Sequence, residues 1–398
     1  MPNRAERTGV AIVGGSIGGL TAAICLKQRG SAVTVYERSP QPMTSRGGGI
    51  VLQTNIVEWL RESTGFDVDA SCTSTEYLRY FGPSNEMVFN ERRLWHNASW
   101  AIIHTHLLGV FGSEDYRTGM SAVGVESKSD NATLRFLDRP DVRADLVVFA
   151  DGIQSVGRRR LARQSVSEYA GYVGWRGTVA EGELSVETRR LLGDAMSYCV
   201  LPNSHMVLYP IPAPDGDIEP GRRLVNFVWY RNFEDGPELD ELLTDRRGQR
   251  CAVSVAMGEV QERSVSSLHR AAELELPPVA AEVVVKTKQP YIQVIQDTAV
   301  DRMVHDRCVL LGDAAFALRP HAAAGTSKAV ADAVALGECL ARAEWNIDAA
   351  LKAWEGPQIE LGRNLARRVR EMGTRSQFGG SWIPGDPTFE FGLYGPNQ

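Results

Sequence analysis

Three short segments of the sequence place a glycine turn or a carboxylate at the end of an apolar run, where either could bind a phosphorylated ligand. In the first, an apolar run over 10–13 leads into a G-x-S-x-x-G pattern. Gly14 permits a tight turn, Ser16 leaves room for a pyrophosphate beside the backbone, and Gly19 allows a helix to pack closely on the strand. The N-terminus of that helix offers free N–H groups and a partial positive charge to phosphates. The segment predicts a dinucleotide-binding turn.

A carboxylate at the expected distance supports this interpretation. The run 33–36 alternates like a strand and ends at Glu37, about 20 residues beyond the glycines, where a ribose hydroxyl is usually bound. By itself the glycine turn could be an ordinary connection between a strand and a helix. The strand, the helix and Glu37 together favour a dinucleotide site.

The other two segments carry Asp151 and Asp313. Asp151 begins a D-G-x-x-S-x-x-R pattern after the apolar run 145–150, and Asp313 follows the run 308–311 in a G-D-A-A pattern. Each aspartate alone could be a helix N-cap. Ligands of open α/β sheets bind outside the carboxyl ends of the strands, so we expect all three segments to face one crevice.

These segments need a parallel sheet to position them, and the patterns on either side predict one. The run 145–150 is nearly continuously apolar, which is typical of a buried parallel strand. The stretch 172–285 is instead rich in strands with period-two alternation, separated by Pro and Gly turns, and predicts an antiparallel sheet. Helices are expected over 326–343 and 354–372. The sequence thus predicts an α/β fold with a second, mostly antiparallel sheet.

Composition narrows the class of protein. The 398 residues carry a formal net charge of −6, which argues against a nucleic acid or an anionic membrane as partner. Six scattered cysteines form no C-x-x-C pair, so we expect neither a metal site nor a redox motif, and we expect a cytoplasmic protein. The short polar segment 1–9 does not resemble a signal peptide, and no apolar run is long enough to span a membrane. The sequence leaves the oligomeric state open, a homodimer included.

The three segments, in this order and spacing, resemble those of the FAD-dependent aromatic hydroxylases with the para-hydroxybenzoate hydroxylase fold. The resemblance extends over nearly the whole chain and includes the stretches 174–177 and 319–326, which look most like the members that act on hydroxypyridines. It implies a Rossmann-like FAD-binding domain with a parallel sheet and a substrate domain with a mostly antiparallel sheet. It further implies non-covalent FAD, NADH or NADPH as co-substrate, and hydroxylation of a small electron-rich hydroxypyridine with O2 through a C4a-hydroperoxyflavin.

The resemblance also assigns residues to FAD. Glu37 would hold the adenosine ribose, Asp313 would contact the ribityl or phosphate region, and Asp151 would serve both FAD and NAD(P)H. The cofactor-binding residues would be Gly14, Gly15, Ser16, Ile17, Glu37, Arg38, Gly49, Ile50, Leu107, Asp151, Asp313, Ala323, Ala324, Gly325, Thr326 and Ser327. Many relatives place an Arg on the pyrophosphate in an R-x-x-L pattern, where this chain has His104 followed by Leu107. Many also carry His after G-D-A-A, where this chain has Phe316.

Hydroxylation by an electrophilic oxygen requires an electron-rich ring, so the protein should help a ring hydroxyl to ionise and should exclude water. We expect His321 and Tyr209 to be catalytic. Substrate contacts are expected from Trp175, His205, Asn226 and Pro320. Each of them has a structural alternative, since a strand Tyr or Trp commonly packs in a core and a His beside Pro320 could bond a backbone carbonyl.

The expected domains are discontinuous. Segments 1–73, 97–176 and 286–356 would form the FAD-binding domain, 74–96 and 177–285 the substrate domain, and 357–398 a C-terminal helix and tail. Other functions stay open at this point: a related hydroxylase acting on another phenol or a polycyclic substrate, a non-catalytic flavin-binding protein, or a plain NAD dehydrogenase. Halogenation is disfavoured because no W-x-W-x-I-P motif is found.

Overall fold

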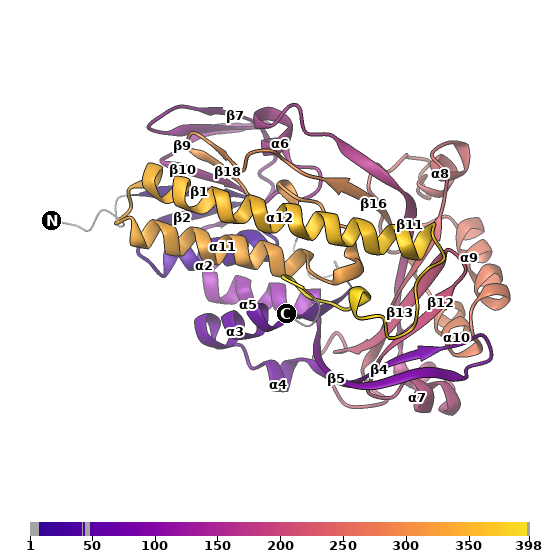
Figure 1. Cartoon of the computed structure of the whole chain (residues 1–398). Coiled ribbons are helices and arrows are strands. Elements are labelled where there is room, and N and C mark those ends of the chain that lie inside the picture. Colours follow the sequence, from indigo (N-terminus) through magenta and orange to yellow (C-terminus); the bar gives the residue numbers. More distant parts are fainter. Residues whose placement is uncertain (1–7, 42, 44–47, 396–398) are drawn as a thin grey trace.

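The computed structural model describes residues 8–41, 43 and 48–395, and its helices and strands are arranged around two main sheets (Figure 1). The first, the parallel sheet, contains in spatial order β17 (Val304–His305), β18 (Cys308–Leu310), β10 (Leu146–Phe149), β1 (Gly9–Val13), β2 (Ala32–Tyr36) and β6 (Tyr116–Arg117). Its pairs are parallel except β17 with β18. The buried parallel strand predicted over 145–150 is confirmed as β10, whose four residues are all fully buried.

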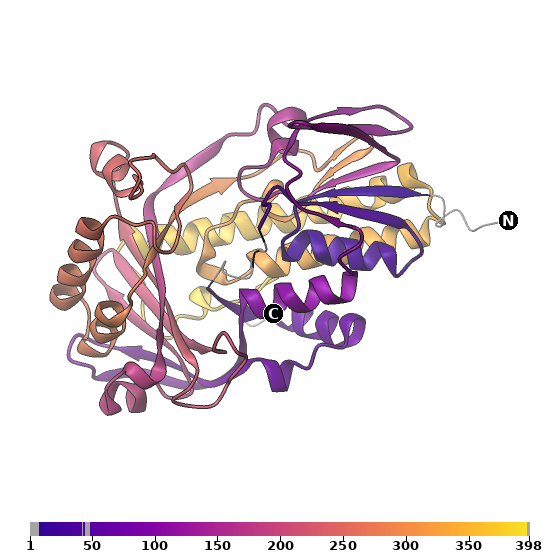
Figure 2. The same cartoon turned by 180° about the vertical axis from the view of Figure 1, so that it is seen from behind.

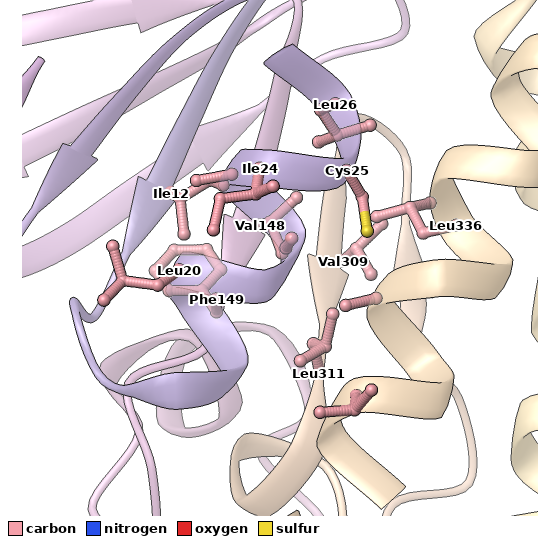
Figure 3. Close-up of a cluster of buried hydrophobic side chains, with 14 of the residues drawn as sticks. Ile12, Leu20, Ile24, Cys25, Leu26, Val148, Phe149, Val309, Leu311 and Leu336 are labelled. Atoms are coloured by element: carbon pink, nitrogen blue, oxygen red, sulfur yellow. The ribbon is translucent and has the colours of Figure 1, made fainter. Parts of the chain in front are cut away.

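Helices cover this sheet and make a continuous apolar core. They are α2 (Ile17–Lys27), α3 (Thr54–Thr64), α4 (Val68–Ser71), α5 (Trp100–Phe111), α6 (Val156–Leu161), α11 (Gly325–Arg342) and α12 (Ile347–Gln377). Figure 3 shows side chains of β1, β10 and β18 meeting those of α2 and α11, among them Leu20, Phe149 and Leu336. Each such fully buried side chain stabilises the fold by roughly 1.5–3 kcal/mol. The core holds the strand ends of the three predicted segments in a constant arrangement.

The second sheet, called the large sheet below, has the order β15-β16-β11-β14-β13-β12-β4-β5-β3. Its strands are β3 (Gly49–Leu52), β4 (Thr73–Phe81), β5 (Met87–Ser99), β11 (Ser167–Ala180), β12 (Ala195–Leu201), β13 (Ser204–Ile211), β14 (Leu224–Asn232), β15 (Ser254–Val255) and β16 (Tyr291–Thr298). Neighbours are antiparallel except β12 with β4, which confirms the mostly antiparallel second sheet.

Four helices cover the outer face of the large sheet, the face turned away from the parallel sheet, whereas α12 (Ile347–Gln377) packs on part of its inner face. The four are α7 (Val186–Leu192), α8 (Pro237–Leu242), α9 (Glu262–Glu275) and α10 (Pro278–Lys286), and Figures 1 and 2 show the last three along that side. Trp175, Phe227 and Trp229 pack there with side chains of these helices. Because side chains alternate along a strand, the residues between them point to the inner face, toward the parallel sheet.

A small antiparallel sheet lies beside the parallel sheet. It contains β7 (Ala122–Ser127), β8 (Ala132–Phe136) and β9 (Arg139–Ala144). β7 and β8 form a hairpin, and β9 pairs with β8.

The long helix α12 contacts elements of both sheets, as Figure 1 shows. It was predicted over 354–372 but begins at Ile347, where the Asn346 side chain accepts a hydrogen bond from Ala349 N at 3.2 Å. Pro357 lies inside it. The following tail packs Trp382 and Phe391 against the inner face of the large sheet. The C-terminal segment therefore completes the wall between the two sheets.

The division into an FAD-binding domain and a substrate domain remains a prediction. Several of its expected boundaries do not coincide with the ends of strands or with the division between the two sheets. The boundary at 176/177 cuts through β11, and segments expected in the FAD-binding domain contribute β3 and β16 to the large sheet. A strand continues through a boundary placed in this way as long as its alternation continues.

Candidate active site

A cavity of about 890 Å³ lies between the strand ends of the parallel sheet and the inner face of the large sheet. Its size is near the upper end of the usual range for small-molecule sites, roughly 300–1,000 Å³. The predicted site residues that line it are Ser16, Ile17, Arg38, Gly49, Ile50, His205, Tyr209, Asp313, Pro320, His321, Ala323, Ala324, Gly325 and Thr326. The structure thus brings most of the predicted cofactor and substrate residues to one cavity.

Two helix N-termini open into this cavity. Helix α2 follows Ser16, and α11 follows Ala324; neither residue makes a side-chain capping bond, and neither first turn holds an acidic residue. Helix N-termini of this kind carry partial positive charge and attract anionic groups. The pair suits a ligand with negative charge at two separated points, such as the pyrophosphate and the reduced flavin ring of FAD.

The first glycine turn is built from backbone packing. Gly14 has a φ of +104°, and a Cβ there would lie 2.4 Å from Ala150 O. A Cβ on Gly19 would lie 1.9 Å from Gly14 O. Only glycine fits these two positions, which places the start of α2 directly against the end of β10 and explains the glycine pattern in the sequence.

Glu37 is buried and orders the same turn. Its Oε2 accepts a hydrogen bond from Gly15 N at 2.9 Å, and its Oε1 accepts one from Ser39 N at 2.8 Å. Neither Gly14, Gly15 nor Glu37 lines the cavity itself. Their assignment to the adenosine half of FAD stays a proposal, in which Glu37 turns from Gly15 N toward the ribose.

His104 and Leu107 of α5 stand where many relatives carry the R-x-x-L pattern, and both have structural roles in this chain. His104 Nε2 lies 3.0 Å from Gly15 O, and because a carbonyl only accepts, the ring donates and steadies the glycine turn. Leu107 is fully buried in the core around the parallel sheet and does not line the cavity. The expected direct contact of Leu107 with the cofactor is therefore corrected to core packing.

The D-G segment is held by helix capping and by one arginine. Asp151 is not the N-cap of α6, which is Ser155, but its Oδ2 accepts a hydrogen bond from Val156 N at 2.6 Å in the first turn, while its buried Oδ1 has no partner among the described residues. Burial raises the pKa of Asp151. Arg158 Nη1 donates to the carbonyls of Asp313 at 3.2 Å and Ala314 at 3.0 Å. The arginine thereby ties the D-G segment to the G-D segment.

Asp313 lies in the 3-10 helix η3 (Gly312–Ala314) and its carboxylate faces the cavity. Burial raises its pKa to about 6, although Arg158 and Lys328 act in the opposite direction. Behind it, Lys328 and Asp332 form a fully buried ion pair of 2.6 Å, and Asp332 Oδ2 accepts from Gly312 N at 3.0 Å. This pair, which the sequence analysis missed, holds the G-D turn in place.

The turn that carries His321 is η4 (Pro320–Ala322), and it faces the inner side of β13 and β14. The His321 Nε2 and the Tyr172 hydroxyl lie 2.6 Å apart, and the buried His321 Nδ1 has no partner among the described residues. Burial, followed by the neighbouring His205 and Arg319, holds the pKa of His321 well below its usual range. His321 is therefore neutral, and it lines the cavity with one buried ring nitrogen left without a partner among the described residues.

His205 and Tyr230 complete an aromatic group around His321. Ring centroids are 5.2 Å apart for His205 and His321, and 4.9 Å apart for Tyr230 and His321. Burial lowers the pKa of His205 to about 3, and Gln377 Nε2 donates to its Nδ1 at 3.0 Å. Tyr209 also lines the cavity, and a Cβ on Gly49 would lie 2.5 Å from its ring, so the start of β3 lies directly against Tyr209.

The other expected cofactor and substrate residues are placed as follows. Trp175 points to the outer face of the large sheet and packs in the core with α8–α10, so its expected substrate contact is wrong. Asn226 lies on the inner face but accepts from Gly49 N at 2.9 Å and does not line the cavity. Ser327 is fully buried in the first turn of α11. Gly47, within the glycine-rich stretch before β3, lies outside the described residues.

Arg176, Tyr198, Tyr230 and Tyr291 line the cavity and were not expected to. Part of this could be predicted for Arg176. It is adjacent to Trp175 on a strand, so one of the two side chains had to face inward, but the alternation of side chains does not tell which one. In the described part of the chain, no group of three or more His, Cys, Asp or Glu side chains could hold a metal ion. No described helix is both long and apolar enough to cross a membrane.

Comparisons with known proteins agree with this geometry. The family model "FAD binding domain-like" matches residues 169–297, and "NAD(P)-binding Rossmann-like domain" matches 12–51. The chain is 38% identical over 385 residues, 96% of this chain and 95% of the relative, to 2,6-dihydroxypyridine 3-monooxygenase of Paenarthrobacter nicotinovorans. It is 25% identical to the FAD-dependent urate hydroxylase of Klebsiella pneumoniae, over 90% of this chain and 88% of that one.

A solved structure extends the agreement to three dimensions. The solved structure of 2,6-dihydroxypyridine-3-hydroxylase from Arthrobacter nicotinovorans superimposes with a TM-score of 0.91 at 38% identity, covering 97% of this chain and 96% of that chain. FAD fits the cavity described above, with its two helix N-termini and its glycine turns. The chain belongs to the family of FAD-dependent aromatic hydroxylases with the para-hydroxybenzoate hydroxylase fold, and it is an FAD-dependent monooxygenase.

Proposed function

We propose that this enzyme hydroxylates 2,6-dihydroxypyridine to 2,3,6-trihydroxypyridine with NAD(P)H and O2. The observation that carries the proposal is the 38% identity, over 96% of the chain, to a monooxygenase named for that substrate. When bound, FAD supplies the redox chemistry: it takes a hydride from NAD(P)H and activates O2 for electrophilic attack on the ring.

The chain's own residues have three tasks in this proposal. The backbone at Ser16 and Ile17 and the first turn of α11 bind the anionic parts of FAD, with Glu37 on the ribose and Asp313 beside the ribityl chain. The cavity wall of aromatic side chains excludes water, which would otherwise divert activated oxygen to hydrogen peroxide. His321, neutral and with a buried Nδ1 that has no partner in the described part of the chain, accepts a hydrogen bond from a ring hydroxyl at that atom and so polarises it, and Tyr209 orients the ring.

The test is NADH and NADPH oxidation by the purified, yellow protein against a panel of hydroxypyridines, phenols and urate. We expect 2,6-dihydroxypyridine to stimulate oxidation most strongly and to yield a trihydroxypyridine. Stronger stimulation by another phenol would assign the enzyme to that substrate. A protein that binds FAD but never consumes NAD(P)H in response to a ring would be a flavin-binding protein without turnover. A protein that neither holds nor takes up FAD would sink the proposal.

The remaining expectations concern the surroundings of the enzyme. We propose a cytoplasmic location, supported by six cysteines that are all free. A homodimer is a further proposal that size-exclusion chromatography with light scattering tests directly. Neither proposal affects the assignment of the cavity.

A further inference from the structure

Arg176 is a cation in the cavity wall that has no counter-ion. The charged residues among the described lining are Arg38, Arg176 and Asp313, and Arg176 is the one contributed by the large sheet. Its Nε is buried without a hydrogen-bond partner, and among the described residues no carboxylate lies within 4.0 Å of its guanidinium. The sequence analysis and the mechanism above leave this side chain without a role.

The neighbours of Arg176 are neutral hydroxyl groups. It lies on the inner face, paired with Val228 of β14 and Tyr291 of β16. Burial lowers its pKa, but the nearby hydroxyls of Tyr291, Tyr230 and Tyr209 outweigh this and leave the pKa raised, so the guanidinium stays charged. Burial raises the pKa of Tyr230 to about 12 and raises that of Tyr209 as well, so neither supplies a negative charge near neutral pH.

A half-buried cation without a counter-ion is an unfavourable arrangement that a negatively charged ligand would relieve. Arg176 lies close to the predicted substrate region. Tyr230 is one of its neighbours, and the ring of Tyr230 lies next to that of His321, with the ring centroids 4.9 Å apart. A planar guanidinium presents parallel N–H groups that match two neighbouring acceptors on a flat ring. The oxygen of the ionised hydroxyl group and the adjacent ring nitrogen of a 2-hydroxypyridine are such a pair.

We infer that Arg176 is the anion-binding residue of the substrate site and makes the enzyme selective for the ionised form of a small hydroxylated aromatic ring. This inference rests on the proposed function and deepens it. Arg176 stabilises the ionised ring relative to the neutral ring, whichever group accepts the proton. The ionised ring is also the more electron-rich form, so the residue that selects it favours the species that reacts with electrophilic oxygen.

The experiment compares two rings of the same substitution in FAD-loaded protein. Dissociation constants are measured from the change in flavin absorbance for 2,6-dihydroxypyridine, which can ionise, and for 2,6-dimethoxypyridine, which has no acidic hydroxyl. We expect Arg176→Gln to weaken binding of the first by roughly 10- to 100-fold and of the second by no more than about twofold. Arg176→Lys should fall between wild type and Arg176→Gln. Arg231→Gln, which removes a cation from the outer side of the same sheet, should change neither.

Each other result has a definite meaning. Equal losses for both rings, or no loss for either, would overturn the inference. So would an unchanged preference together with a lower flavin midpoint potential in Arg176→Gln, because Arg176 would then serve the reduced flavin. Selective anion binding by a wild-type enzyme that hydroxylates no hydroxypyridine would refute the proposed function alone. Normal hydroxylation that does not depend on Arg176 would refute this inference alone.

Discussion

The two walls of the cavity differ in composition: backbone atoms form most of one, called the backbone wall, and side chains form most of the other, called the substrate wall. The wall at the strand ends of the parallel sheet consists largely of backbone at the start of α2, which the glycine turn positions, and at the start of α11. The opposite wall consists of side chains on the inner face of the large sheet, among them Arg176 and Tyr209. A backbone wall suits a cofactor, whose phosphates and flat ring are the same in every relative. A side-chain wall can change from one relative to the next and therefore suits the substrate.

The contrast between backbone and side chains also explains which parts of the site could be predicted from the sequence. Gly14, Gly19 and Glu37 have roles set by backbone geometry at fixed spacing, so their pattern alone predicted the turn, the crevice and a dinucleotide, and the family resemblance then implied FAD. The carboxylates Asp151 and Asp313 followed from their positions after apolar runs. The parallel sheet and the mostly antiparallel sheet could be predicted for the same reason, because hydrophobic periodicity is a local property.

Residues of the other wall were harder to predict because their roles depend on which face of a strand looks inward. Trp175 was chosen over Arg176, although the two are adjacent and point to opposite faces. Contacts between distant segments, such as Tyr172 with His321 and Asp332 with Gly312, leave no spacing signal in the sequence. The boundary expected at 176/177 likewise lies inside β11, which continues to Ala180.

The largest expected effect tests the outer face of the substrate wall. Trp175→Ala should lower the free energy of unfolding by roughly 3–5 kcal/mol, because it leaves a cavity in a fully packed core. The measurement is urea denaturation followed by far-UV circular dichroism. Trp175→Phe, which keeps most of the volume, should retain the product formed per NADH. A large change in that ratio for Trp175→Phe would place Trp175 at the substrate after all.

The next effect tests the backbone wall. Gly14→Ala should lower the free energy of unfolding by about 3 kcal/mol, because a Cβ would meet Ala150 O in a backbone conformation that favours glycine. The variant should also retain less FAD after dialysis. Gly65→Ala is the matched control: its φ is +67° but no atom lies within 4 Å, so about 1 kcal/mol is expected. Equal losses would mean that crowding at Gly14 plays no part.

Asp313 gives a pH-dependent test of the same wall. Its pKa is raised to about 6 in the folded protein, so the folded state favours the protonated form. Stability from this group is full below pH 4 and is lost as pH rises through 6, by up to about 3 kcal/mol. Apoprotein carrying Asp313→Asn should lack this loss when denaturation is compared at pH 4 and pH 7. The FAD-loaded variant should nevertheless lose cofactor more readily than wild type, and equal FAD retention would show that Asp313 has only a structural role.

The smallest expected effect concerns coupling at the substrate wall. His321→Ala and Tyr209→Phe should still oxidise NADH when substrate is present but should release severalfold more hydrogen peroxide per product, because a lost polar contact admits water and loosens the ring. The two quantities are measured together by peroxidase assay and chromatography. An unchanged ratio in both variants, with normal substrate affinity, would place the substrate elsewhere in the cavity.

The central claim is that both walls serve one reaction, the transfer of one oxygen atom from O2 to a hydroxypyridine bound in this cavity. The most direct test is turnover of 2,6-dihydroxypyridine by the wild-type enzyme under ¹⁸O2, with mass spectrometry of the product and parallel measurement of NAD(P)H consumed. The account predicts a trihydroxypyridine that carries one labelled oxygen, formed in near-equal amount to the NAD(P)H oxidised. An unlabelled product, or NAD(P)H oxidation that ends entirely in hydrogen peroxide with this ring bound, would contradict it.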